Sequence, residues 1–427
     1  VRSRGLGDVY KRQMLGSYSE TALSGVAAVN QIQFIYQQLL MALGDGLVIF
    51  CSQYWGKRQT EPMKKISATA MHAGLLIAIL LFALVSIFPR QAVGIFTTEE
   101  SIIREGVSYL SIIRFTYLFF AVTQILLATL RSVEVVKIAF YLSVMTFFVN
   151  CGINYVLIYG HFGAPEMGAA GAAIGTLAAR MTELVVLIIY IIKKEKQLHL
   201  SIRSYLQHDR VLSGDYFRVT APMLVVQGLW GVNTALQTVI LGHMTAAAIA
   251  ANSVASTIFM MVKSMAVGAA STASIIIGNT IGTGDIALVK KYSGRLQRIF
   301  VVIGLVSGLL LFLIRVPILQ LYDLSASTKE MANTFLIILS VVVIGMSYQM
   351  PTNNGIIRGG GNAMFVVKMD LISIWGIVIP LSFVMAFVVK ASPAVVVCCL
   401  NADQIFKCIP AFLESHYGNW IRKLTRE

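Results

Sequence analysis

Long apolar segments separated by short polar ones run along almost the whole chain. Eleven of these segments are long enough to cross a hydrocarbon core of about 30 Å as an α-helix. The expected helices cover residues 24–50, 66–88, 107–130, 137–160, 168–192, 217–241, 246–277, 296–315, 333–356, 364–389 and 394–415. The pattern therefore predicts an all-α polytopic membrane protein.

Composition and charge support this class. The chain is 57% hydrophobic and 13% charged, whereas a soluble protein carries roughly 25% charged residues. Its net charge of +14 could indicate nucleic-acid binding, but 21 Lys and Arg lie in the loops on one side of the expected membrane and 5 on the other. This bias follows the positive-inside rule. It excludes nucleic acid as a partner, predicts contact with membrane lipids, and places the C-terminus in the cytoplasm of a multi-pass cell (plasma) membrane protein.

A sequence repeat at a spacing of 226 indicates two related halves. The matching residues are Leu15, Gly16, Gly56, Lys64 and Lys65 in the first copy and Leu241, Gly242, Gly282, Lys290 and Lys291 in the second. Six expected spans separate the copies, and an even number means that both enter the membrane in the same sense. The repeat thus predicts two parallel six-helix bundles related by a pseudo-two-fold axis.

The repeat also suggests where the bundles begin and end. The counterpart of span 217–241 would end near residue 15, yet residues 1–13, "VRSRGLGDVYKRQ", have no apolar core. We therefore expect a chain that lacks its first helix and carries a foreign or truncated leader, with a native cytoplasmic start as the alternative. The expected parts are the leader 1–13, an N-terminal bundle 14–192 (spans 2–6), a cytoplasmic linker 193–216 and a C-terminal bundle 217–427 (spans 7–12).

Four segments carry a family resemblance. They are "NCGINYVLIYGHFGAPEMGAAGAAIGT" (150–176), "VTAPM" (219–223), "IIRGGGN" (356–362) and "WGIVIPLSF" (375–383). In order and spacing the chain resembles the multidrug and toxic compound extrusion (MATE) transporters. The resemblance implies a V-shaped pair of bundles that exports amphipathic, often cationic, organic compounds by antiport against Na⁺ or H⁺ with alternating access. We expect a monomer whose only cofactor is this coupling ion.

Polar side chains inside the spans are the candidates for substrate binding. Amides facing lipid would be costly, so they should face a cavity or another helix. A Trp beside amides on one helix face suits a flat aromatic cation. The candidates are Gln33 and Gln37 in span 24–50, Gln227, Trp230, Asn233 and Gln237 in span 217–241, and Gln349 and Asn353 in span 333–356. The alternatives are hydrogen bonding between helices for the amides of span 24–50 and packing between helices for Trp230.

Five residues are candidates for cation coupling: Asn150, Asn154, Thr176, Asp45 and Asp370. The resemblance implies a site at the first three, where many relatives carry Asp at the second position; the amide of Asn154 can bind Na⁺ but cannot take up a proton. Asp45 and Asp370 have no partner near them in sequence, and an unpaired intramembrane charge suggests function. The alternatives are hydrogen bonding between helices for Asn150, Asn154 and Thr176, a basic partner on another helix for Asp45, and solvation for Asp370.

The remaining intramembrane charges favour structural roles. Arg180 with Glu183, and Asp403 with Lys407, have the spacing of ion pairs on one helix. Arg114 and Lys263 remain as unpaired basic residues. They are the argument for the rival function, a lipid-linked precursor flippase that holds a pyrophosphate.

Other motifs argue against an enzyme or a metal protein. The five cysteines have no metal-ligand spacing. The Gly-rich segment 278–285 follows a span rather than a strand and lacks GK[ST], so its glycines are expected to allow close helix approach. With neither a catalytic triad pattern nor a nucleotide-binding motif in the sequence, we expect no enzymatic activity and no direct use of ATP.

Overall fold

A computed structural model describes residues 20–425 except 97–98, 208, 243–245 and 321–324. The expected leader 1–13 and the first copy of the Leu-Gly pair lie outside these residues. The chain forms two compact units. Unit 1 consists of Val1–Leu47 and Thr60–Phe217, and unit 2 of Val48–Gln59 and Arg218–Glu427.

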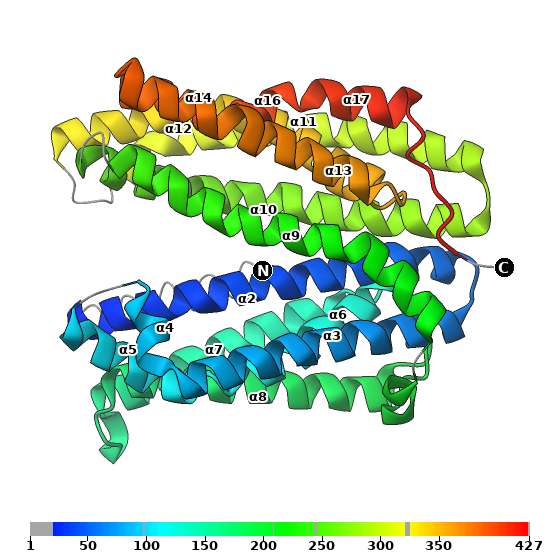
Figure 1. The fold of residues 1–427 in the computed structure, drawn as a ribbon, viewed down its shortest axis with the longest axis horizontal. Helices are drawn as coiled ribbons and strands as arrows, with labels where there is room; N and C mark the ends of the chain where they lie inside the picture. Colours follow the sequence, from blue (N-terminus) through cyan, green and yellow to red (C-terminus); the bar gives the residue numbers. More distant parts are fainter. Residues whose placement is uncertain (1–19, 97–98, 208, 243–245, 321–324, 426–427) are drawn as a thin grey trace. The chain divides into compact units, whose positions relative to one another are not determined.

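Unit 1 is built from α-helices that lie side by side (Figure 1). Its elements are the first part of α2 (Glu20–Gly56), α3 (Thr60–Ile87), α4 (Pro89–Gly94), α5 (Glu100–Ile113), α6 (Thr116–Ser132), α7 (Lys137–Tyr159), α8 (Gly168–Lys194) and the short 3₁₀ turns η1 (His161–Gly163) and η2 (Ile202–Leu206). The chain bends by 52° between α5 and α6. The expected span 107–130 is therefore a bent pair of helices.

Unit 2 contains more irregular helices. Its elements are most of α9 (Arg210–Gly242), α10 (Ala246–Thr283), α11 (Ile286–Gln320), α12 (Ala326–Pro351), η3 (Thr352–Ile357), α13 (Ala363–Asp370), η4 (Leu371–Val378), α14 (Ile379–Phe383), η5 (Val384–Val388), α15 (Pro393–Leu400), α16 (Asp403–Phe406) and α17 (Cys408–Tyr417). The segments η3, η4 and η5 are π-helical. Because a π-turn adds a residue to the helical repeat, each π-segment shifts the direction of the side chains that follow it.

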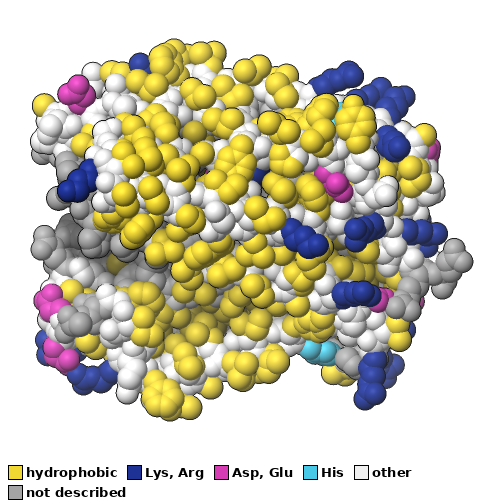
Figure 2. Space-filling model, turned by 45° about the horizontal axis from the view of Figure 1, so that its top comes forward, with side chains coloured by type: hydrophobic (Ala, Val, Ile, Leu, Met, Phe, Trp, Pro, Cys, Tyr) yellow, Lys and Arg dark blue, Asp and Glu magenta, His cyan; other side chains and the backbone are white. Residues whose placement is uncertain are grey.

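The described residues form an all-α polytopic membrane fold. Nine of their helices are long and apolar enough to cross a membrane, or ten if the bent pair α5–α6 counts as one span. The expected span 217–241 forms part of one helix, α9, which is not among the nine; these are counted over the described residues alone. Large apolar side chains cover much of the face drawn in Figure 2, as contact with lipid requires.

The repeat seen in the sequence recurs in the helix boundaries. Helices α3 and α7 begin at Thr60 and Lys137, and α11 and α13 begin 226 residues later in each case. Helix α8 and its counterpart α15 begin 225 residues apart. The single helices α7 and α8 thus correspond to the interrupted runs α13–η5 and α15–α17 of unit 2.

Glycines allow two helix ends to cross closely within unit 2. A Cβ at Gly56 would overlap the carbonyl oxygen of Asn279, and one at Gly282 would overlap that of Gln53. The packing role expected for the Gly-rich segment is confirmed. Gln53 also binds the segment near the C-terminus. Its amide donates a hydrogen bond to the Arg422 carbonyl (3.0 Å) and accepts one from the Leu424 N–H (2.8 Å).

Residues 193–216, expected as a linker, contact α3 within unit 1. The hydroxyl of Ser67 donates to the Tyr205 hydroxyl at 3.2 Å, and Lys65 pairs with Asp209 at 3.2 Å. Asp209 also accepts from the backbone N–H of Leu212 at the start of α9. This hydrogen bond, followed by the one from Lys65, holds the pKa of the Asp209 carboxyl below its usual value.

Candidate functional site

Three of the expected coupling residues form one hydrogen-bonded chain between α7 and α8. The Asn154 amide donates to Asn150 Oδ1 (2.6 Å), the Asn150 amide donates to Thr176 Oγ1 (3.3 Å), and that hydroxyl donates to the Ala172 carbonyl (3.0 Å). Asn154 is 1% exposed, and its Oδ1 is buried without a hydrogen-bond partner. A Cβ on Gly175 would overlap that oxygen, so a larger residue there would displace the Asn154 side chain.

Asp45, the first choice as a coupling residue, belongs to an ion pair. Its Oδ1 lies 3.2 Å from Arg131 Nη2 on α6, and both side chains are about one-third exposed (31% and 32%). The expectation that Asp45 is unpaired is wrong, and the alternative of a basic partner on another helix holds. Sequence periodicity could not reveal this pair because the two residues are 86 positions apart.

Unit 1 holds a second ion pair on α8. Arg180 Nη1 lies 2.7 Å from Glu183 Oε2, as the spacing predicted. The Glu183 side chain is fully buried and that of Arg180 is 13% exposed. The Arg180 guanidinium also lies over the Phe120 ring at 5.0 Å. The buried carboxylate of this helix thus has its counter-charge one turn away.

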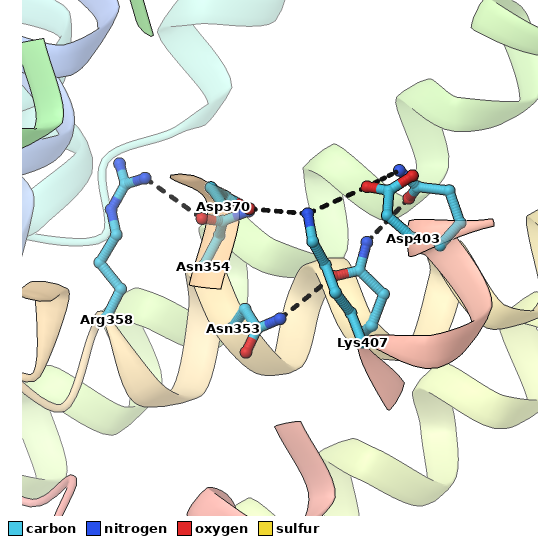
Figure 3. Close-up of polar contacts among 8 residues, drawn as sticks. Asn353, Asn354, Arg358, Asp370, Asp403 and Lys407 are labelled. Carbon is cyan, nitrogen blue, oxygen red and sulfur yellow. Dashed lines mark hydrogen bonds and ion pairs between the residues drawn. The ribbon is translucent and has the colours of Figure 1, made fainter. Parts of the chain in front are cut away.

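In unit 2, one lysine is shared by two carboxylates. Lys407 Nζ lies 2.8 Å from Asp370 Oδ1 and 3.0 Å from Asp403 Oδ2, and Figure 3 shows the lysine between them. The Asp403–Lys407 pair was expected; the expectation that Asp370 has no partner is wrong. The side chains of Lys407, Asp403 and Asp370 are 3%, 5% and 27% exposed. We call these three residues the charged triad.

A chain of amides ends on the triad. Gln404 donates to Asp403 Oδ2 (2.9 Å), Gln349 donates to Gln404 Oε1 (2.8 Å), and Asn353 donates to Gln349 Oε1 (3.1 Å) (Figure 3). Gln349 and Asn353 were expected at a substrate site. Gln404 was missed, although its position next to Asp403 could have indicated it. Every N–H of the chain points toward the Asp403 carboxylate, the orientation that stabilises its negative charge.

The residues of this network lie at interruptions of the helices. Asp370 is the last residue of α13 before the π-segment η4, and Asp403 is the first residue of α16. Lys407 lies between α16 and α17, and Asn353 lies in η3. Because π-segments and broken helices in membrane proteins often form functional sites, the network is the strongest candidate site of unit 2.

One candidate residue of α9, Trp230, already contacts a charged side chain of a neighbouring helix. Lys263 Nζ of α10 lies over the Trp230 ring at 5.2 Å from its centroid. A ring face that we expected to receive an organic cation therefore already contacts an ammonium group. Asn233 is buried, whereas Gln227 and Gln237 are half-buried.

The two basic residues that favoured a flippase both lie on aromatic rings. Lys263 lies on Trp230, and the Arg114 guanidinium lies 5.6 Å from the Phe82 ring and 5.3 Å from the Phe115 ring. Neither is the isolated cation that the sequence suggested.

The remaining two candidates, Gln33 and Gln37, are half-buried and one turn apart on the unit 1 part of α2. Between them Tyr36 is buried, and its hydroxyl donates to the Tyr117 carbonyl at 2.6 Å. The described residues contain no group of three or more His, Cys, Asp or Glu side chains placed to hold a metal ion.

Comparison with known proteins agrees with the fold and its repeat. The model of the MatE family matches residues 12–156 and 222–384. The chain is 25% identical over 379 residues to the probable multidrug resistance protein YoeA of Bacillus subtilis, covering 86% of this chain and 80% of that protein. It is 24% identical over 422 residues to the probable multidrug resistance protein NorM of Thermotoga maritima, covering 97% and 89%.

Solved structures show the same fold. A mutant of the Vibrio cholerae MATE transporter VcmN matches with a TM-score of 0.86 at 15% identity, over 99% of this chain and 94% of that one. The eukaryotic MATE transporter AtDTX14 matches with a TM-score of 0.82 at 18% identity, over 98% and 92%. Because the family model covers more than half of the chain and the fold agrees over nearly all of it, this membrane transporter belongs to the MatE (multidrug and toxic compound extrusion) family.

Proposed function

We propose that the protein exports amphipathic, mostly cationic, organic compounds by antiport against Na⁺ or H⁺. Two relatives that match over most of the chain are named as probable multidrug resistance proteins. The observation that carries the proposal is the chain of two buried amides and one half-buried amide that runs from Asn353 to a carboxylate inside membrane-spanning helices. Amides can both donate and accept hydrogen bonds, so they can bind polar substrates of varied structure, and a carboxylate can bind and release a cation.

The proposed export uses alternating access to the two sides of a plasma membrane, with the C-terminus and residues 193–216 in the cytoplasm. The charge bias of the loops supports this orientation. The protein acts as a monomer in contact with lipids and needs neither nucleic acid nor a cofactor apart from the coupling ion. The substrate is bound by polar and aromatic side chains of three helices: Gln33, Gln37, Gln227, Trp230, Asn233, Gln237, Gln349 and Asn353. Because Lys263 lies over one face of the Trp230 ring, only the rest of that ring can contact the substrate.

The neutral chain of Asn150, Asn154 and Thr176 serves the coupling ion in unit 1 only if that ion is Na⁺, because none of these groups takes up a proton at neutral pH. In unit 2 the triad supplies ionisable groups. The two units thus offer two different kinds of coupling chemistry.

Ethidium accumulation in a host without its own efflux pumps tests the proposal. Cells that express the protein should accumulate less ethidium than cells that carry the empty vector, and ionophores that dissipate the ion gradients should abolish the difference while ATP is kept constant. The Asn353→Ala variant should restore accumulation, because it removes the outer donor of the amide chain. Thr334→Ala, an exposed change on α12, is the matched control.

Two results would count against the proposal. One is export that continues without any ion gradient and stops when ATP alone is depleted. The other is equal ethidium accumulation with and without the protein at normal expression.

A further inference from the structure

An open groove lies on the surface of unit 2 among α11, α12 and α17, at the end of the unit where α11 begins and α17 ends (Figure 1). Its volume is about 490 Å³. Val301 and Phe412 belong to the apolar part of its lining, and Arg298 and His416 to the polar part. We propose that the groove binds one anionic phospholipid, with the phosphate on Arg298 and an acyl chain along Val301 and Phe412. The inference needs only the membrane fold and does not depend on which compound is transported.

The position of Arg298 along α11 places it at the edge of the hydrocarbon core. An uncharged, largely apolar run, residues 299–314, separates it from Arg315. At about 1.5 Å per residue, the two arginines lie about 25 Å apart along the helix, close to the thickness of a hydrocarbon core. Val301 and Leu305, which follow Arg298 into this run, are both exposed. Arg298 therefore lies at the level of the lipid headgroups, and the apolar side chains after it lie at the level of the acyl chains.

Arg298 ends a basic stripe on α11 that consists of Lys291, Arg295 and Arg298. These residues are four and three positions apart, so they share one face of the helix, and all three are exposed. None of the three side chains has a hydrogen bond or an ion pair with another residue that the structure describes. The guanidinium of Arg298 can therefore bind two phosphate oxygens at once. The rest of the stripe adds positive charge that attracts anionic lipid.

The sequence repeat shows what the corresponding face contacts in unit 1. At the spacing of 226, Lys65 and Thr69 of α3 correspond to the first two residues of the stripe. Lys65 pairs with the Asp209 carboxylate at 3.2 Å, and Thr69 Oγ1 lies 2.8 Å from Ser213 Oγ. The protein thus supplies an anion and a hydroxyl to this face in unit 1. Within the described part of unit 2 no side chain takes their place, so the membrane is the source of the anion.

The groove is held in place by contacts among its own helices. Gln297 of α11 is buried, and its Oε1 accepts from the Tyr348 hydroxyl of α12 (2.7 Å) and the Ser415 hydroxyl of α17 (3.3 Å). On α17 the His416 ring stacks on the Phe412 ring, with centroids 4.1 Å apart. A lipid that contacts both α11 and α17 therefore enters a groove whose walls are already ordered, and binding needs little rearrangement of the protein.

Lipid binding by the purified full chain in a neutral detergent tests the inference. In native mass spectrometry, a short-chain phosphatidylglycerol should bind about tenfold more tightly than phosphatidylcholine of the same chain length, because only the first has a net negative charge. Arg298→Gln should lower the affinity for phosphatidylglycerol about tenfold, because it removes the guanidinium that binds the phosphate. Arg218→Gln removes an exposed arginine of α9 outside the groove, and it should bind like the wild type.

A second variant fills the groove and keeps every charge. Gly294 lines the groove, and a Cβ there would meet open space, so the ring of Gly294→Phe can occupy the place of the lipid without disturbing the helices. Gly214→Phe adds the same ring at another open position, on α9, and is the matched control. Phosphatidylglycerol should raise the melting temperature of the wild type and of Gly214→Phe, but not that of Gly294→Phe.

Several results would overturn the inference. Equal affinity for the two lipids would mean that the headgroup charge is not recognised. Wild-type affinity in both Arg298→Gln and Gly294→Phe would place the lipid elsewhere, and an equal loss in Arg298→Gln and Arg218→Gln would reduce the effect to general attraction by basic charge. Stabilisation by inorganic phosphate at the concentration of the lipid would mean an anion site that needs no acyl chain. None of these measurements involves ethidium, so they decide the inference whether or not the proposed cargo is correct.

Discussion

The helix pair α7–α8 of unit 1 and its repeat counterpart in unit 2 carry polar networks of different kinds. In unit 1 the two helices are unbroken, and the network that joins them consists of two amides and a hydroxyl. In unit 2 the corresponding runs are divided by π-segments and short breaks, and they are joined by two carboxylates and a lysine. One repeated scaffold thus holds a network without titratable groups in one unit and an ionisable one in the other.

The two networks differ in charge balance as well. In unit 1 the buried Glu183 forms an ion pair with Arg180 on its own helix. In unit 2 Lys407 has two partners on different helical runs. Loss of one member of the Arg180–Glu183 pair is destabilising, because the other charge remains in apolar surroundings. A shared lysine keeps a partner when one carboxylate is replaced, so the loss of Asp370 should cost less.

The largest expected effect tests this difference in balance. Glu183→Gln leaves Arg180 without its counter-charge and should lower the free energy of unfolding by about 3–5 kcal/mol. Asp370→Asn should cost about 1 kcal/mol or less, because Asp370 is partly exposed and Lys407 keeps Asp403. Thermal unfolding of both variants in the same detergent measures the contrast. Equal losses would contradict the contrast between the Arg180–Glu183 pair and the shared lysine.

The next prediction concerns the close packing of α8 against α7 in the unbroken pair. A Cβ at Gly171 of α8 would overlap the backbone carbonyl of Leu157 on α7. Gly171→Ala should therefore destabilise unit 1 by about 1–3 kcal/mol. Gly152→Ala is the control, since open space surrounds that position on α7. Thermal unfolding should separate the two variants, and equal stability would mean that the helices can move apart at little cost.

A smaller effect is expected from cutting the link between charge and amides in unit 2. Gln404→Leu removes a donor to Asp403 and an acceptor for Gln349, at a cost of about 1–2 kcal/mol. Because the change breaks the amide chain that contains two of the proposed substrate residues, ethidium affinity should decrease. Unchanged ethidium affinity would mean that Gln349 and Asn353 bind the substrate without the link to Asp403.

The smallest effect is expected at the ion pair of α2 and α6. Both side chains are about one-third exposed, so Asp45→Asn should cost only about 0.2–1 kcal/mol. Ethidium export driven by an ion gradient should remain, since Asp45 is held by Arg131 and is not part of the triad. Loss of gradient-driven export at normal stability and expression would move the coupling residue from unit 2 to unit 1.

Local features of the candidate site could be read from the sequence. Asn150 and Asn154 are one helical turn apart, as are Gln349 and Asn353. The two side chains of each pair are hydrogen-bonded to each other. The pairs Arg180–Glu183 and Asp403–Lys407 were predicted for the same reason. Such contacts depend only on the helical period, which brings residues three or four positions apart onto one face.

The partners of Asp45 and Asp370 could not be read in this way. Asp45 meets Arg131 from 86 residues away, and Asp370 meets Lys407 from 37 residues away. Which faces meet depends on the rotation of each helix about its axis, and the π-segments change that rotation within a span. The packing of the helices therefore decides that Asp370 contacts Lys407 and belongs to the triad.

Apolar segments of membrane-spanning length, the charge bias of the loops and the repeat at 226 residues were determined by the sequence alone. The hydrocarbon core imposes a minimum length on each apolar run, and this requirement is local. The tertiary structure decided which polar side chains inside those runs meet. A helix satisfies its own backbone in any orientation, so only packing against other helices selects the face on which a charge finds its partner.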